Sequence, residues 1–91
     1  MTVQHDAEGS RFVVSLPDGD AQLIYAPFGD DILDLQHTEV PPSGQGQDVG
    51  DALVRAALAH ARERQLRVIA TCPYVQAWLR RHPEERPGAR P

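Results

Sequence analysis

The first half of the chain alternates short apolar runs with turn residues, a pattern typical of β-strands. Residues 11–16 (RFVVSL) and 21–25 (AQLIY) are rich in β-forming side chains, with Pro-Asp-Gly between them. Proline presets φ and glycine accepts a positive φ, so this stretch predicts a hairpin. A second turn is expected at residues 27–30 (PFGD), and the alternating residues 31–40 (DILDLQHTEV) predict a third strand.

The third predicted strand has two faces of different chemistry, because successive side chains of a strand point to opposite sides. One face is expected to carry Leu33, Leu35, His37 and Glu39. The other is expected to carry Ile32, Asp34, Gln36, Thr38 and Val40. Two prolines follow and end the strand, since proline cannot donate to a ladder.

The second half of the chain has helical periodicity. Residues 49–65 place apolar side chains on one stripe, and residues 73–81 form a second predicted helix with proline at its first position. Residues 67–71 (RVIAT) predict a short buried strand. The order β-β-β-α-β-α predicts an α/β fold of mixed α+β character. Its βαβ unit should cross over right-handed, which gives a mixed, twisted sheet with the helices packed on it.

A chain of 91 residues is expected to form one domain. We expect this domain to span residues 11–83. Residues 1–10 are polar and predict a flexible N-terminus, and residues 84–91 predict a disordered tail.

Composition excludes several classes of protein. The formal net charge is −4, and the nine basic residues are all arginine and are spread along the chain, so no nucleic-acid partner is expected. The single cysteine rules out an intramolecular disulfide. No apolar run approaches membrane-spanning length and no signal segment stands at the N-terminus, so we expect a soluble cytoplasmic protein.

Three glycines, Gly44, Gly46 and Gly50, fall between the third strand and the first helix. A helix N-terminus offers unpaired N–H groups, and glycines let the backbone approach an anion closely, so the corner predicts a phosphate or diphosphate cradle. No Gly-Lys-Ser/Thr follows, which excludes a Walker loop. A plain glycine-rich turn is the alternative.

Two motifs carry a family resemblance. HTEVPP followed by QGQDVGDALV, and then TCPYV-x-x-WL-x-RHPE, resemble the small YjdJ-type branch of the GNAT (Gcn5-related) N-acetyltransferases. The resemblance covers roughly residues 11–85. It implies an acetyltransferase fold that binds acetyl-CoA, with the diphosphate held by residues 45–50, the pantetheine arm paired with backbone around Val40, and the site where two parallel strands splay.

The resemblance implies a set of cofactor-binding residues. They are Thr38, Val40, Gln45, Gly46, Gln47, Asp48, Val49, Gly50, Asp51 and Cys72. Asp48 falls where the family usually has a glycine, and a carboxylate beside a diphosphate is repulsive. Either the loop register shifts by one residue, so that Gly44 and Gly46 approach the ligand, or Asp48 caps the helix and points away.

Cys72 stands at the predicted N-cap of the second helix, where free N–H groups and the helix dipole favour a thiolate. The alternative is an inert buried side chain. In larger relatives a tyrosine seven residues further on serves as the acid, but that position here is Leu79. The resemblance therefore implies that Cys72 lies near the thioester as nucleophile or thiol sensor, or that water protonates the leaving thiolate.

His37 and Glu39 are the candidate general base for the attacking amine, directly or through water. Exposed polar residues on an open sheet face are the alternative interpretation. A metal site would need a third ligand that the sequence does not supply, so no metal is expected.

The expected function is transfer of an acetyl group from acetyl-CoA to an unidentified amine, either a small molecule or a protein amine. The rival is a CoA-binding module that is non-catalytic or weakly catalytic. A purely structural domain would leave the glycine corner unexplained. We expect a monomer or a weak dimer.

Overall fold

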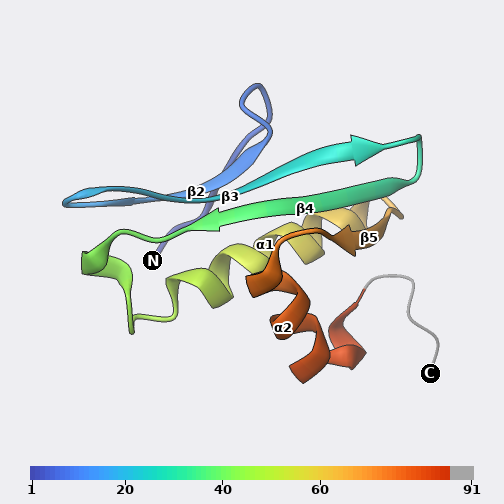
Figure 1. Cartoon of the computed structure of the whole chain (residues 1–91). Helices are drawn as coiled ribbons and strands as arrows, with labels where there is room; N and C mark the ends of the chain where they lie inside the picture. Colours follow the sequence, from blue (N-terminus) through green and yellow to red (C-terminus); the bar gives the residue numbers. More distant parts are fainter. Residues whose placement is uncertain (87–91) are drawn as a thin grey trace.

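The computed structural model describes residues 1–86 and contains a five-stranded sheet in the order β1-β2-β3-β4-β5 (Figure 1). The first four strands pair antiparallel, and β4 pairs with β5 parallel. This confirms the predicted mixed sheet. The elements are β1 (Gln4–Asp6), β2 (Arg11–Leu16), β3 (Gly19–Phe28), β4 (Ile32–Glu39), η1 (Pro42–Gly44), α1 (Val49–Glu63), β5 (Arg67–Ala70), α2 (Pro73–Arg81) and η2 (Pro83–Glu85).

Both helices lie on one face of the sheet (Figure 1). The apolar stripe of α1 buries Leu53, Val54, Ala57, Leu58 and Ala61 against the strands. From the sheet, Phe12, Val14, Leu23, Leu33 and Leu35 meet this stripe in a single core. Trp78 of α2 is 1 % exposed and closes the core on its side. One-sided covering leaves the other face of the antiparallel strands free to carry polar side chains.

The second turn lies later than the sequence indicates. Strand β3 runs to Phe28, and Pro27 pairs with Leu33 inside the ladder. The turn begins instead at Gly29, whose φ of +74° suits glycine. Strand β2 pairs with β3 only as far as Ile24. Pro27 lies beyond this pairing, so its missing N–H removes no hydrogen bond between β2 and β3.

The expected regular alternation along β4 is wrong, because the strand contains a β-bulge. Ile24 pairs with His37 and Tyr25 pairs with Leu35, so Gln36 is an extra residue without a partner. The bulge reverses the alternation beyond it. Thr38, opposite the buried Leu23, therefore faces the helices together with Leu35.

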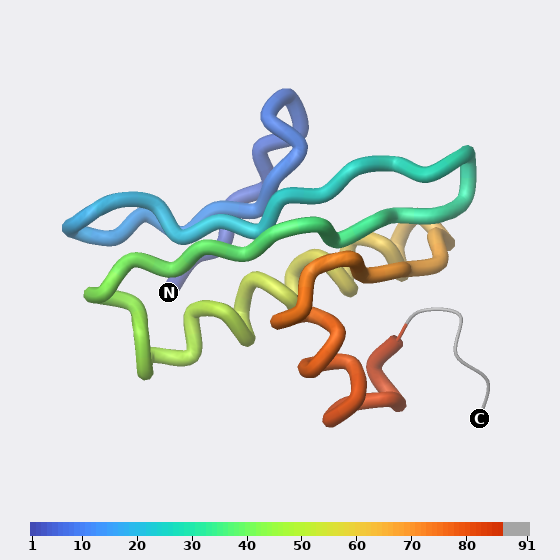
Figure 2. The backbone as a smooth tube through the Cα atoms, viewed as in Figure 1, coloured from blue at the N-terminus to red at the C-terminus, as the bar shows by residue number. Residues whose placement is uncertain are grey.

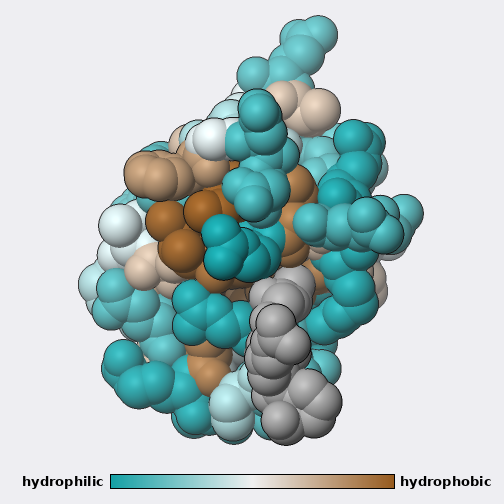
Figure 3. Space-filling view, turned by 90° about the vertical axis from the view of Figure 1, so that its right-hand side faces the viewer, coloured by the Kyte–Doolittle hydropathy of each residue, from teal (hydrophilic) through white to brown (hydrophobic). Residues whose placement is uncertain are grey.

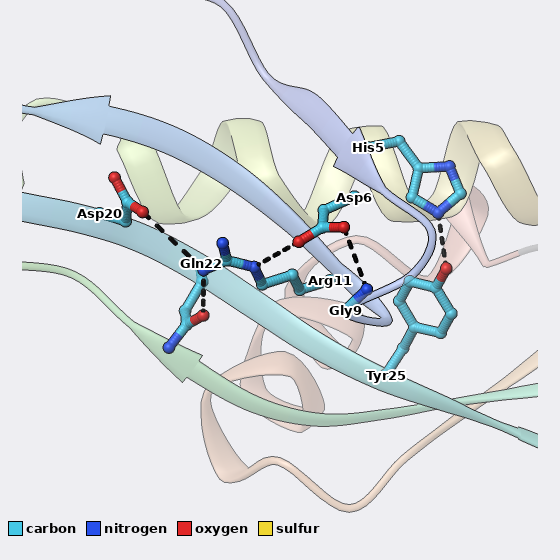
Figure 4. Close-up of polar contacts among 7 residues, drawn as sticks. All are labelled: His5, Asp6, Gly9, Arg11, Asp20, Gln22 and Tyr25. Atoms are coloured by element: carbon cyan, nitrogen blue, oxygen red, sulfur yellow. Dashed lines mark hydrogen bonds and ion pairs between the residues drawn. The ribbon is translucent and has the colours of Figure 1, made fainter.

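The N-terminal segment expected to be flexible contains the edge strand β1. His5 stacks on Phe12 with ring centroids 4.4 Å apart, and its Nε2 lies 2.6 Å from the hydroxyl of Tyr25 (Figure 4). Arg11 Nε donates to Asp6 at 2.9 Å, and the same carboxylate accepts the N–H of Gly9 (Figure 4). These cross-strand partners explain why a polar segment pairs with β2.

The start of the expected C-terminal tail is held by specific contacts. Glu85 lies 2.6 Å from the guanidinium of Arg55, and Arg86 donates to the carbonyl of Val68 on the edge strand β5 at 2.9 Å. The prediction of a disordered tail therefore differs from the structure at residues 84–86. The remainder of that prediction, residues 87–91, lies outside the described residues.

The two ends of the sheet differ in character. The tube in Figure 2 follows β4 from the β3–β4 turn to the loop that precedes α1. At the turn end Phe28 is 60 % exposed, and Figure 3, which looks onto this end, shows apolar residues gathered among polar ones. The loop end carries the glycine corner.

Neither α1 nor α2, in the described part of the chain, has the length and apolar character that a membrane span needs.

Candidate cofactor site

Strands β4 and β5 separate halfway along β4. Their parallel pairing ends at Leu35 and Ala70, and the carbonyl of Leu35 then accepts the N–H groups of both Thr71 and Cys72 at 3.1 Å. The chain turns there into α2, whereas β4 continues to Glu39. Within residues 1–86, the β5-facing edge of β4 beyond Leu35 therefore has no strand partner.

A cavity of about 420 Å³ opens beside this edge. It lies between the end of β4, the glycine loop, and the first turns of α1 and α2. Its lining residues are Thr38, Val40, Gly44, Gln45, Gly46, Asp48, Val49, Gly50 and Tyr74. Seven of these were expected from the sequence, whereas Gly44 had been considered only in the shifted register and Tyr74 had not been considered.

The three glycines have three separate roles. A Cβ on Gly44 would lie 2.6 Å from Leu16 Cδ1 and 3.0 Å from Val40 Cγ1, so Gly44 permits close packing beneath the loop. Gly46 has a φ of +79° and open space around it. A Cβ on Gly50 would lie 2.5 Å from the hydroxyl oxygen of Tyr74. Gly46 therefore adopts a backbone conformation that other residues rarely adopt, and its backbone is accessible from the cavity.

Asp48 is the N-cap residue of α1 by position, but the side-chain cap that the sequence allowed is absent. The residue has a left-handed backbone with φ 60° and ψ 24°, and its side chain makes no capping hydrogen bond. Its backbone carbonyl accepts the first helical bond, from the N–H of Ala52 at 3.0 Å. The N–H groups of residues 49–51 precede that bond and lack helical partners. Asp48 itself lines the cavity.

Asp51, expected at the cofactor, instead joins the two helices. Its carboxylate accepts hydrogen bonds from Trp78 Nε1 at 2.9 Å and Arg55 Nε at 3.0 Å. Burial raises the pKa of Asp51, but these two donors and the charge of Arg55 outweigh it and hold the pKa below its usual value. The Arg55 guanidinium also lies 5.1 Å from the centre of the Trp78 ring.

Cys72 is buried at the separation of the strands, 3 % exposed. Its Sγ lies 3.6 Å from the hydroxyl of Thr38. It is the N-cap residue of α2, as expected, but its side chain makes no capping hydrogen bond. The sulfur of Cys72 therefore contacts Thr38, the residue of β4 that faces the helices because of the bulge.

His37 and Glu39 share one face, opposite to Thr38, as the sequence predicts, but the expectation that Leu33 and Leu35 lie on that face with them is wrong. His37 Nε2 lies 3.4 Å from Glu39 Oε1, and Gln22 also donates to Glu39. Both side chains are more than half exposed. Neither lines the cavity, because the bulge sends them to the uncovered side of the sheet.

The position that matches the general-acid tyrosine of larger relatives is Leu79, which offers no proton donor. Leu79 is 5 % exposed and belongs to the core. Tyr74, five residues earlier, is 41 % exposed and lies in the cavity wall. Burial together with the Asp51 and Asp48 carboxylates raises the pKa of Tyr74, against a smaller opposing effect of Arg81. Tyr74 belongs to the TCPYV stretch that carries the family resemblance, but only the packing of α2 against α1 reveals that it lies in the cavity wall.

The chain matches known proteins over most of its length. Residues 11–87 match the family model of GCN5-related N-acetyl-transferases. Protein NATD1 of Bos taurus is 39 % identical over 83 residues, which cover 89 % of this chain and 74 % of that protein. Protein NATD1 of Homo sapiens is 37 % identical over the same shares of both chains.

The fold also matches a solved structure. A GCN5-like protein from Staphylococcus aureus, determined by NMR in solution, superposes with a TM-score of 0.72 at 24 % identity. The match covers 92 % of this chain and 82 % of that one. At this identity the likeness establishes the fold, and the family model establishes the membership. This chain therefore belongs to the GCN5-related N-acetyltransferase family.

Proposed function

We propose that this protein binds acetyl-CoA in the cavity beside β4 and transfers its acetyl group to an amine. One observation carries the proposal: the unpaired edge of β4 and the unpaired amides of the α1 N-terminus border the same cavity. An elongated ligand with an amide-bearing arm and a diphosphate matches these two features together.

The donors at the start of α1 fit a diphosphate. The N–H groups of residues 49–51 lie at the positive end of the helix dipole, and Gly46 leaves open space in front of its backbone. Asp48 opposes binding, because two unit charges about 4 Å apart repel by roughly 1 kcal/mol even in water. Residues 45–50 are therefore proposed to hold the diphosphate chiefly through backbone amides.

The edge of β4 fits the amide-bearing arm. Residues 38–40 border the cavity, and beyond Leu35 this edge of the strand has no β5 partner. The backbone near Val40 is proposed to pair with pantetheine as a further strand would. When bound, acetyl-CoA supplies an activated acyl group as a thioester.

Thr38 and Cys72 are proposed to lie near the thioester, since they meet where the strands part. The attacking amine needs to lose a proton. The His37–Glu39 pair stands on the uncovered side of the same part of β4, and we propose that it accepts this proton through water. The acceptor remains an unidentified amine, either a small molecule or a protein amine.

A non-catalytic CoA-binding module is the second candidate. Two observations favour it: the position matched to the family's acid is the buried Leu79, and both base candidates face away from the cavity. A monomer or weak dimer in the cytoplasm remains our prediction for either function.

Acetyl-CoA turnover separates the two candidates. The protein is incubated with acetyl-CoA and a panel of small amines and peptide N-termini, and thiol release is compared with that from protein alone. Amine-dependent thiol release together with an acetylated amine in the mass spectrum supports transfer. Saturable binding of CoA without amine-dependent release would leave the binding module, and absence of both would refute the proposed function.

A further inference from the structure

Tyr74 connects the first turns of the two helices. It is the second residue of α2, and its phenol reaches over Gly50, the second residue of α1. A Cβ at position 50 would lie 2.5 Å from the phenol oxygen and 2.9 Å from Cζ. Gly50 is helical and has no positive φ, so the backbone does not require glycine there. The space that the phenol occupies explains the glycine.

The cavity is poor in positive charge. In the described chain, residues 1–86, no arginine is among its lining residues, and Asp48 adds a negative charge. Its side-chain donors are the hydroxyls of Thr38 and Tyr74 and the amide of Gln45.

Two of these three donors have contacts elsewhere. The Thr38 hydroxyl lies beside Cys72 Sγ at 3.6 Å, and the Gln45 amide donates to the carbonyl of Val40 at 3.2 Å. The Tyr74 hydroxyl is the one in contact with the first turn of α1. It therefore lies where the helix presents its unpaired amides.

We propose that Tyr74 is a positioning residue whose hydroxyl donates a hydrogen bond to a phosphate oxygen of a diphosphate-bearing cofactor held at the first turn of α1. The interaction compensates for the charge of Asp48 and for the lack of a basic side chain among the described residues that line the cavity. This inference rests on the proposed function, since it assumes that the diphosphate binds there.

The geometry assigns Tyr74 to the phosphates rather than to the reacting sulfur. The phenol contacts α1, whereas the thiol of Cys72 contacts Thr38 on β4. Tyr74 is 41 % exposed, which leaves the hydroxyl accessible to a ligand. With burial and the neighbouring carboxylates raising its pKa, the phenol keeps its proton and remains a donor at neutral pH.

The test compares the wild-type protein with Tyr74→Phe, which keeps the ring and removes the hydroxyl. Dissociation constants for CoA and for pantetheine, which lacks the diphosphate, are measured by NMR titration. We expect Tyr74→Phe to weaken CoA binding by about tenfold, the size of one hydrogen bond to a charged group, and to change pantetheine binding less than about twofold. The melting temperature of the free protein should stay the same.

A second variant moves the hydroxyl without removing it. Gly50→Ala forces the phenol away from α1, so this variant should also weaken CoA binding more than pantetheine binding. Alanine is the better helix former, so a loss of helix propensity cannot explain the weaker binding. The ³¹P resonances of bound CoA should shift between wild type and Tyr74→Phe. A purely structural role for Tyr74 would not move them.

The outcomes separate this inference from the function on which it rests. If wild type binds CoA and Tyr74→Phe binds it equally well, the role of Tyr74 is refuted and the CoA site stands. Equal losses for CoA and pantetheine would likewise refute a contact with the diphosphate. If wild type does not bind CoA at all, both the site and the role of Tyr74 are refuted.

Discussion

The Sγ atom of Cys72 lies 3.6 Å from the hydroxyl of Thr38, although 33 residues separate them in the chain. The contact depends on the bulge in β4, since regular pairing beyond Leu35 would have turned Thr38 to the other face. It marks the point at which β4 leaves β5, and it gives the buried thiol a polar neighbour beside the cavity.

We predict that Cys72→Ala lowers acetyl transfer at least tenfold while leaving CoA affinity within about twofold. The thiol is proposed to act at the thioester, whereas the amides of α1 hold the diphosphate. Steady-state turnover and direct titration separate the two effects. Thr38→Val is the matched control, because it removes the hydroxyl and keeps the thiol. Unchanged turnover in Cys72→Ala would reduce Cys72 to a packing residue.

We predict that Asp51→Ala destabilises the protein by about 1–3 kcal/mol, because it leaves the buried indole N–H of Trp78 without its acceptor. Asp51→Asn keeps an oxygen at the same place and should cost less. Trp78 is the only tryptophan, so urea unfolding followed by its fluorescence reports directly on this contact. An Asp51→Ala variant as stable as wild type would show that the hydrogen bond contributes nothing.

We predict that stability falls as the pH drops below about 6.5, the ordinary pKa of histidine. Burial, then the neighbouring His5 and Arg64, lower the pKa of His60 in the folded protein, against a smaller opposing effect of Glu63. The unfolded chain therefore takes up its proton first on acidification, and the folded state loses stability until the folded pKa is passed. The His60 ring lies 4.5 Å from that of His5, so protonation of both would add repulsion.

His60→Gln tests this dependence. The variant should lose less stability between pH 7 and pH 5 than wild type, measured as the urea midpoint at each pH. His37→Gln is the matched control, because the His37 side chain is 59 % exposed on the opposite side of the sheet. Parallel pH profiles for wild type and His60→Gln would assign the acid sensitivity to other groups.

We predict that Gly44→Ala destabilises the fold by about 1–3 kcal/mol. The added methyl would lie 3.0 Å from Val40 Cγ1 and 3.2 Å from Val49 Cγ2, and both are stiff β-branched side chains. Ala59→Gly, on the exposed side of α1, is a control that costs about 1 kcal/mol through helix propensity alone. A Gly44→Ala variant as stable as wild type would mean that the loop moves freely away from Val40.

The element order was predictable because it rests on local patterns. Alternation, the Pro-Asp-Gly turn and the apolar stripe of residues 49–65 act over a few neighbours, and the structure confirms the strands and helices that they indicate. The edge strand β1 was missed, since residues 1–10 show little apolar alternation. Its partners, Phe12 and Tyr25, lie on other strands.

The site was predictable in outline and not in detail. The glycine corner and the strand–helix order located the cavity. No glycine or proline in the sequence indicates the bulge at Gln36. The side of the sheet on which Thr38 and His37 lie relative to the helices could therefore not be inferred. Tyr74 escaped notice because its place in the cavity depends on the packing of α2 beside Gly50, a contact between residues 24 positions apart.

Titration of isotope-labelled protein with acetyl-CoA, followed by amide chemical shifts, tests the central claim most directly. Binding in the proposed cavity should give saturable shifts at Thr38, Val40, Gly46, Gly50 and Tyr74. His5 of β1, which packs against His60 near the C-terminal end of α1, should be unaffected. No saturable shift at these five residues up to millimolar acetyl-CoA, or saturable shifts confined to another surface, would contradict it.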